Sequence, residues 1–199
     1  MARFQLSRSR RAVSVALAAA VVVVGALWAS GTFDTPLDAH LLSVGQMPTG
    51  WAAYNVSGNG LGCLGTSLAP VGEAPTARAT IGFDYGGSIP AVVERLANYP
   101  NATTAYRSIV GNLIACTTLS GQSGGQALSG TVGPLSFPRF ADASEAFEAN
   151  FALGGTHLGE ELVIVRKGNT IMAFDEGGNP SLIPSQCQGF VEKALMKLP

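Results

Sequence analysis

The sequence has little charge, few histidines and few cysteines. Of its 199 residues 13% are charged and 8% are aromatic, while two are His and three are Cys. This composition excludes a coiled coil and a charged disordered tail, and three cysteines are too few for a disulfide-dense miniature scaffold. With 47% hydrophobic residues, the chain is long enough to bury a core as one domain of ordinary size.

The twelve basic and thirteen acidic residues nearly cancel, but they are unevenly placed. Arg3, Arg8, Arg10 and Arg11 precede the first apolar run, so the rest of the chain has eight basic against thirteen acidic residues. An acidic domain of this kind lacks the positive surface that binds phosphate backbones. We therefore expect no nucleic-acid partner.

One long apolar run follows the arginines. Residues 12–33 contain no charge, and as a helix they would extend about 33 Å, enough to cross a bilayer core. Because basic residues stay on the cytoplasmic side, residues 1–11 are expected in the cytoplasm and residues 34–199 outside it. The pattern predicts a transmembrane signal anchor at 12–33, held in the cell membrane. The alternative is a signal peptide cleaved near Ala29-Ser30-Gly31, which would release a secreted protein.

An extracytoplasmic domain has its cysteines in an oxidising compartment, where thiols tend to pair. Three cysteines allow one bridge. Cys187 lies on the apolar face of an expected C-terminal helix, where a cysteine usually packs as a small hydrophobic residue. We therefore expect a disulfide between Cys63 and Cys116, which would close a loop of about 50 residues and stabilise the fold by about 4 kcal/mol in the chain-entropy model. Pairings with Cys187 stay open.

Hydrophobic periodicity and turn residues predict an α+β domain. Alternating apolar residues and the short turns between the later segments favour antiparallel strands. The expected strands are 51–57, 77–85, 126–135, 143–153, 158–166 and 170–175, and the expected helical segments are 37–44, 89–98, 102–116 and 184–198. Their segregation favours one antiparallel sheet of five or six strands, with three or four helices packed on one face.

The closest match to a catalytic motif surrounds Ser123. Gly121-Gln122-Ser123-Gly124-Gly125 fits the G-x-S-x-G pattern of α/β-hydrolases, and Asp142 and His157 follow in the chain order of a catalytic triad. That motif requires a strand before the serine and a helix after it, whereas the residues after Ser123 are strand-like. The sequence therefore predicts no catalytic residues and no enzyme. A secreted serine hydrolase using Ser123 and His157 is the alternative.

Metal and cofactor sites are not expected. The two histidines, His40 and His157, are 117 positions apart, and no C-x-x-C or H-x-x-H spacing occurs. Glu160-Glu161 and Asp175-Glu176 are adjacent carboxylates, but neighbouring residues of a strand point to opposite faces and do not act on one group. No glycine cluster has the G-x-x-x-x-G-K pattern of a phosphate-binding loop. We therefore expect no metal and no cofactor.

Three parts of the chain resemble the extracellular sensor domain of PknH-type Ser/Thr kinases and related exported actinobacterial proteins. They are Leu41-Leu42 with Met47-Pro48-Thr49-Gly50-Trp51, Asn112-Leu113-Ile114-Ala115-Cys116, and Val165-Arg166-Lys167-Gly168-Asn169-Thr170. The resemblance extends over most of residues 37–198. It implies an antiparallel sheet packed on helices around a cleft that holds a ligand, without catalytic residues. The chain departs from that family in having three cysteines, where the kinase sensor domains have two bridges. Exported PsbP-like lipoproteins share the order of elements, but this chain has no lipobox cysteine.

Together these patterns predict a membrane-anchored, extracytoplasmic binding or sensor-like domain of the bacterial cell envelope, without catalysis. Because helices packed over a sheet can leave an apolar cleft, the expected ligand is a small apolar molecule such as a lipid or an envelope glycolipid. The aromatic residues available to line such a groove are Trp51, Tyr54, Phe83, Tyr85, Phe137 and Phe140. The sequence does not identify which residues contact the ligand. The alternative from the structural class is a protein that tethers a partner through an exposed apolar patch.

Overall fold

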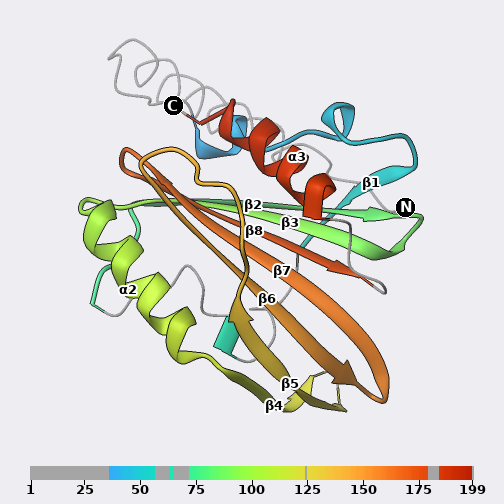
Figure 1. The fold of residues 1–199 in the computed structure, drawn as a ribbon. Helices are drawn as coiled ribbons and strands as arrows, with labels where there is room; N and C mark the ends of the chain where they lie inside the picture. The colour runs from blue at the N-terminus through green and yellow to red at the C-terminus, as the bar shows by residue number, and fades with distance from the viewer. Residues whose placement is uncertain (1–35, 57–62, 65–71, 124, 179–183, 199) are drawn as a thin grey trace, which may run out of the picture. The chain divides into compact units, whose positions relative to one another are not determined.

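A computed structural model describes residues 36–56, 63–64, 72–123, 125–178 and 184–198 of the chain (Figure 1). Among these residues no helix is long and apolar enough to cross a membrane. The expected anchor at 12–33 lies outside the described residues, as does the basic segment before it. Residues 37–199 form one compact unit, and all the elements below belong to it.

The described elements are strands, two α-helices and two short 3-10 helices. The 3-10 helices are η1 (Leu37–His40) and η2 (Val44–Gln46), and the α-helices are α2 (Ala102–Ala115) and α3 (Pro184–Leu195). The strands are β1 (Trp51–Tyr54), β2 (Ala77–Tyr85), β3 (Ser88–Asn98), β4 (Thr118–Ser123), β5 (Gln126–Pro134), β6 (Ala143–Leu153), β7 (Thr156–Lys167) and β8 (Thr170–Gly178). The expected α+β class is confirmed.

All eight strands belong to one antiparallel sheet in the order β1-β2-β3-β8-β7-β6-β5-β4. The chain builds β1 to β3 first, crosses through α2, and then returns from the far edge through β4 to β8. The last strand therefore pairs with β3 in the interior of the sheet, where Leu96 lies opposite Met172. The pairing of β3 with β8 joins the first three strands to the later five.

The segment 89–98 is a strand, so the helix expected there is wrong. Val92 and Leu96 pack in one hydrophobic core, while Ala97 packs in another. A short run with apolar residues on both sides fits a helix or a strand that is covered on both faces, and periodicity alone does not separate the two. Pairing with β2 on one side and β8 on the other favours the strand.

The sheet has eight strands rather than the expected five or six, in part because β4 was not predicted. Thr118–Ser123 has the sequence TLSGQS, and Leu119 is its buried hydrophobic residue. This strand lies at the edge of the sheet and is held there by backbone pairing with β5. Its sequence therefore needs no alternation of apolar residues. By contrast, the helix expected at 102–116 and the strand expected at 143–153 are confirmed by α2 and β6.

Each face of the sheet has its own hydrophobic core. Ile109 and Leu113 of α2 lie in the core that contains Ile164 of β7, whereas Val191 of α3 lies in the core that contains Val163. Successive residues of a strand point to opposite faces, so the two α-helices cover opposite faces of the sheet (Figure 1). The expectation that all helices pack on one face is therefore wrong.

Cys63 and Cys116 form a disulfide, which is the pairing that the sequence favours. Their Cα atoms are 5.9 Å apart, and 53 positions of sequence separate them. The bridge ties the residue after α2 to the segment between β1 and β2. Cys187 is free and lies on α3 with no exposed surface.

Candidate functional site

An aromatic groove lies on the α3 side of the sheet, between β1, the β2–β3 hairpin and α3. Its volume is about 520 Å³, and its lining includes Trp51, Tyr85, Pro90, Phe190 and Lys193. Trp51 and Tyr85 lie directly opposite each other on paired strands. The groove therefore brings together side chains from the beginning and the end of the domain.

The aromatic rings hold one another in edge-to-face contacts. Ring centroids are 6.2 Å apart for Trp51 and Tyr85 and 5.6 Å apart for Trp51 and Phe190, and this geometry is favourable because ring edges and faces carry opposite partial charge. Tyr85 keeps 52% of its surface exposed. Gly50, at φ 96°, permits this arrangement, since a Cβ there would lie 2.6 Å from the Tyr85 ring.

Lys193 adds a positive charge to this aromatic groove. Its Nζ atom lies 5.7 Å from the centroid of the Phe190 ring and donates a hydrogen bond of 3.1 Å to the carbonyl oxygen of Gln46. An ammonium group has three N–H donors, so this hydrogen bond leaves donors for another acceptor. The combination of aromatic rings and one cation suits a ligand with an apolar body and an acidic group.

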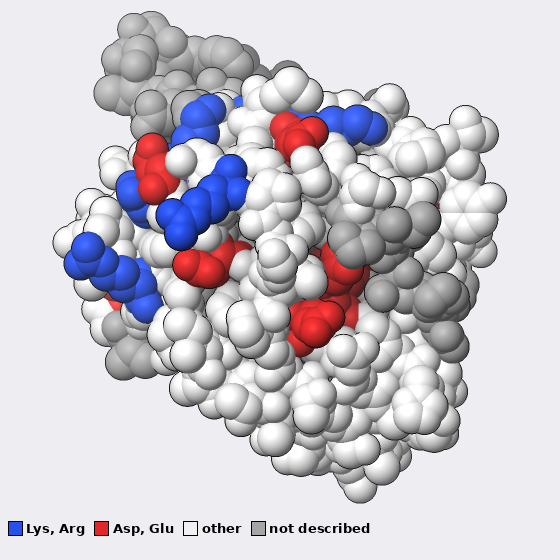
Figure 2. All heavy atoms as spheres, viewed as in Figure 1, with Lys and Arg blue, Asp and Glu red and all other residues white. Residues whose placement is uncertain are grey.

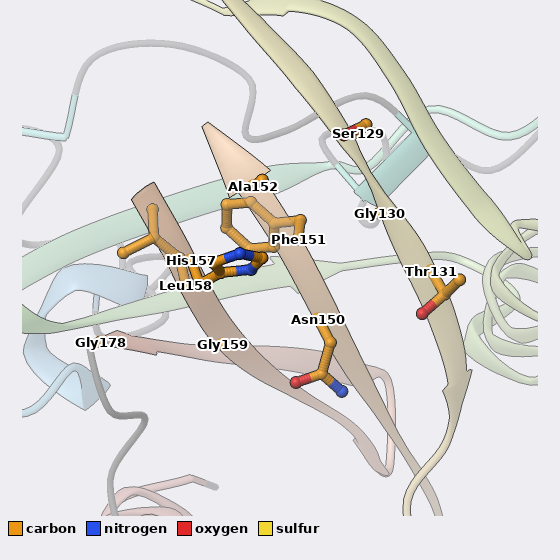
Figure 3. Close-up of a pocket in the computed structure, with 10 residues that line it drawn as sticks. All are labelled: Ser129, Gly130, Thr131, Asn150, Phe151, Ala152, His157, Leu158, Gly159 and Gly178. Atoms are coloured by element: carbon orange, nitrogen blue, oxygen red, sulfur yellow. The ribbon is translucent and has the colours of Figure 1, made fainter. Parts of the chain in front are cut away.

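A second, more polar groove of about 650 Å³ lies across β5, β6 and β7 (Figure 3). Its lining includes Thr131, Asn150 and His157, together with Gly159 and Gly178. The register places Thr131, Asn150, Gly159 and Gly178 in one row across four strands. Figure 3 shows these polar side chains on separate neighbouring strands.

A row of three glutamates borders this polar groove. Glu148 lies opposite Glu161, and Glu161 lies opposite Glu176, on β6, β7 and β8. Glu148 is exposed, but Glu161 is 6% exposed and Glu176 has no exposed surface. In Figure 2 some acidic side chains lie in the middle of the face, and others lie among the Lys and Arg side chains toward its upper and left parts.

Cys187 of α3 completes a buried group with two of these glutamates. One ligand atom from each of Glu161, Glu176 and Cys187 lies within 4.8 Å of the other two. Burial raises the pKa of the Cys187 thiol, and the nearby Glu176 and Glu161 carboxylates raise it further. Burial also raises the pKa of Glu161, against the opposing effect of its hydrogen bond with Cys187. The cluster was not expected from the sequence, because its two carboxylates are neighbours across strands rather than along one strand.

The positions of the turn residues predict which glutamates are opposite each other. The turns at Gly154-Gly155 and Gly168-Asn169 separate β6 from β7 and β7 from β8. Counting outward from these two tight turns gives the register, and it pairs Glu148 with Glu161 and Glu161 with Glu176.

The other face of the sheet has a separate polar group beyond the α2 core. Arg95 of β3 forms a salt bridge with Asp175 of β8. Burial lowers the pKa of Arg95, and the negative charge of Glu160 opposes that shift. Burial raises the pKa of Glu160 to about 7. Arg95 is therefore paired with Asp175, and Glu160 is a second acidic group that acts on its charge.

The structure does not bring together the residues of the hydrolase alternative. Asp142 and His157 lie at opposite ends of the β6–β7 pair, since Ala143 pairs with Arg166 and Ala152 pairs with His157. Nine strand residues between them correspond to about 30 Å. Asp142 instead accepts hydrogen bonds from the Arg166 side chain, at 3.2 Å, and the Gly168 N–H, at 2.8 Å.

Ser123 is also far from His157. Ser123 ends β4 and is followed by strand β5, where the hydrolase motif needs a helix. His157 lies on β7, three strands away in the sheet order, which corresponds to about 14 Å at 4.8 Å per strand. His40, the other histidine, contacts the carbonyl oxygen of Lys197 through Nδ1 at 2.6 Å.

The fold is similar to a solved extracellular domain. No protein-family model and no curated protein matches the chain. Its structure matches the crystal structure of the extracellular domain of PknH from Mycobacterium tuberculosis with a TM-score of 0.56 and 13% sequence identity, over 79% of this chain and 94% of that chain. The resemblance inferred from short motifs is therefore confirmed at the level of the fold.

Proposed function

We propose that residues 37–199 are an extracytoplasmic, sensor-like domain that binds a small amphiphile in the aromatic groove. The observation that carries this proposal is the convergence of Trp51, Tyr85 and Phe190, from three separate elements, on one open groove of about 520 Å³. A concave site with an apolar lining and few polar groups is the usual form of a small-molecule site.

The proposed location rests on three observations. The fold is similar to an extracellular domain, the described residues contain a disulfide, and the sequence has an uncharged run at 12–33 after four arginines. Disulfides persist in oxidising compartments outside the cytoplasm. These observations support a domain on the outer side of the cell membrane, anchored through 12–33 or secreted after cleavage.

The chemistry of the groove favours a fatty acid or the acyl part of an envelope glycolipid. An acyl chain in contact with the rings removes apolar surface from water, which is worth about 25 cal/mol for each Å² buried. The Lys193 ammonium offers a partner to an acidic head group. Binding, rather than chemistry on the ligand, is the proposed activity.

The test is quenching of Trp51 fluorescence by a brominated fatty acid. Trp51 is the sole tryptophan of residues 37–199, and bromine quenches an indole that it contacts. Both hydrophobic cores are built from residues of this unit, so the unit can be used without the preceding segment. We expect saturable quenching that is relieved by the non-brominated acid.

Two variants make the test specific to the groove. Tyr85→Ala removes a half-exposed lining ring and should weaken binding about tenfold, as loss of one well-placed aromatic contact does. Ile114→Ala removes an apolar side chain that is 65% exposed on α2 and should leave quenching unchanged. Quenching that is absent, or that is equal in wild type and Tyr85→Ala, would refute the proposal. In that case the exposed Tyr85 and Ile89 would favour a protein partner.

A further inference from the structure

The cluster of Glu161, Glu176 and Cys187 is buried on the α3 side of the sheet, apart from the aromatic groove. Glu161 and Glu176 are directly opposite on antiparallel strands, and Cys187 reaches them from α3. Glu161 Oε2 is buried and has no hydrogen-bond partner among the described residues. A buried carboxylate oxygen in this situation normally carries a cost, because it has lost water and gained no other partner.

Two ionised carboxylates side by side also repel each other in a buried position. The salt bridges among the described residues join Arg95 to Asp175 and Arg166 to Asp142, and neither includes Glu161. The charged group that faces Glu161 from the neighbouring strand β6 is Glu148, another acid. A divalent cation would relieve both the repulsion and the loss of water.

We propose that Glu161, Glu176 and Cys187 bind one Zn²⁺ ion, with water as the fourth ligand. Thiolate and carboxylate groups are both zinc ligands, and three protein ligands with one open position form a common zinc geometry. Zinc bonds of about 2.0–2.3 Å place neighbouring ligand atoms about 3.5 Å apart, so the atoms, now within 4.8 Å of one another, need to close by about 1 Å. This site was not expected from the sequence, because its ligands are not close in sequence.

A route into the site leads from the polar groove. Two residues along the strands from Glu161 and Glu176, on the same face, are Gly159 and Gly178, which also lie opposite each other. Both glycines line the groove and have no side chain to separate it from the glutamates. Glu161 as a whole keeps 6% of its surface exposed, while its Oε2 atom is buried.

Binding would exchange protons for the metal ion. The Cys187 thiol loses its proton as the sulfur–zinc bond forms, so each ion bound releases that proton and any proton held by the two carboxyl groups. The affinity for Zn²⁺ should therefore rise as the pH rises. No oxidation or reduction is involved.

The test is Zn²⁺ binding to the full-length chain, purified in a non-ionic detergent and stripped of metal with a chelator. We expect one Zn²⁺ per chain by calorimetry, with proton release that scales with the ionisation heat of the buffer. Co²⁺ should replace Zn²⁺ and give the sulfur-to-cobalt absorption band of a thiolate ligand. Because Cys63 and Cys116 are paired in the disulfide, that band would report Cys187.

Three variants separate this site from adventitious binding. Mutation of a residue that supports a metal ligand typically lowers metal affinity about 10–100-fold. Cys187→Ser and Glu161→Gln remove ligands themselves, so each should lower the affinity for Zn²⁺ by more than this. Cys187→Ser should also abolish the cobalt band. Glu145→Gln removes an exposed acid of β6 on the opposite face of the sheet and should bind as wild type does. Because a variant could fail to fold, the melting temperature of wild type is also measured, and Zn²⁺ should raise it.

The proposal would be overturned by wild type that binds no Zn²⁺, by binding that survives in Cys187→Ser and Glu161→Gln, or by Co²⁺ bound without a thiolate band. None of these results bears on the aromatic groove, whose test uses Tyr85 and Trp51. The two proposals can therefore fail independently.

Discussion

The backbone N–H of Leu42 donates a hydrogen bond of 2.7 Å to Oε2 of Glu94, whose side chain has no exposed surface. This bond fastens the segment after η1 to the centre of the sheet, across 52 positions of sequence. Burial raises the pKa of Glu94 to about 7, although the Leu42 N–H and the charge of Lys197 oppose the shift. Lys197 itself donates to the carbonyl oxygen of Leu41.

Glu94 makes the stability of the domain dependent on pH. Its pKa is about 4.5 when the chain is unfolded and about 7 when it is folded, so between these values the folded state holds more protons and stability falls as the pH rises. Glu94→Gln stays neutral and keeps an oxygen to accept from Leu42. We expect it to match wild type at pH 5 and to be more stable by about 3 kcal/mol at pH 8, at about 1.4 kcal/mol for each pKa unit.

Urea unfolding at pH 5 and pH 8 checks this prediction. Glu192→Gln alters an exposed glutamate of α3 and should leave the pH dependence unchanged. Glu160 contributes in the same direction, since its pKa is also raised to about 7, so the slope of Glu94→Gln should be reduced but not abolished. An undiminished slope would contradict the assignment to Glu94.

Two neighbouring residues of α2, one buried and one exposed, allow a test of the hydrophobic core on the α2 face of the sheet. Leu113 is 2% exposed, whereas Ile114 is 65% exposed. Leu113→Ala should lower the free energy of unfolding by about 2–5 kcal/mol, because it leaves a cavity. Ile114→Ala should change it by less than about 0.5 kcal/mol. Chemical denaturation of both variants tests the placement of α2, and similar losses in the two would show that this helix is rotated.

Gly130 is required by the close approach of β5 and β6. A Cβ at this position would lie 2.5 Å from the carbonyl oxygen of Asn150, whereas a Cβ at Gly133 on the same strand meets no atom within 4 Å. Gly130→Ala should therefore destabilise the domain by about 1–3 kcal/mol through overpacking. Gly133→Ala should be neutral or stabilising by up to about 1 kcal/mol. Thermal melts of the two variants give the comparison, and equal melting temperatures would argue against this register.

The Cys63–Cys116 bridge should stabilise the domain through the loop that it closes. With 53 positions between the two residues, the chain-entropy model gives about 4 kcal/mol. The variant carrying both Cys63→Ser and Cys116→Ser should lose about this amount in urea unfolding. Wild type in a reducing agent should lose as much, while the double variant should not respond to the reductant. A double variant as stable as the oxidised wild type would contradict the prediction.

The parts of the fold that could be predicted were those with one-sided burial. α2 has a polar and an apolar side, and β6 alternates Phe147, Ala149 and Phe151 with polar residues, so each shows its period in the sequence. β3 is covered on both faces and β4 has few apolar residues, so neither sequence shows the alternation of apolar and polar residues that predicts a strand. The position of α3 opposite α2 depends on packing between distant segments, which no local pattern encodes.

The candidate sites were predictable to a similar degree. Trp51 and Tyr85 were among the aromatic residues expected for an apolar groove, and both line the observed one. Phe190 was not among those aromatic residues, and it belongs to both the hydrophobic core and the groove lining. The partnership of Glu161 with Glu176 required the strand register, and Cys187 joins them only through tertiary packing.

The placement of β8 between β3 and β7 sets an order on the assembly of this domain. As the chain is synthesised, β1 to β3 and later β4 to β7 can pair within their own groups, but each group has an unsatisfied backbone edge, at β3 and β7, until residues 170–178 arrive. Exposed edges of this kind are templates for pairing with other chains. A chain truncated before Thr170 would therefore expose the β3 and β7 edges to other chains, so protection of these edges from aggregation is acquired only once β8 has been synthesised.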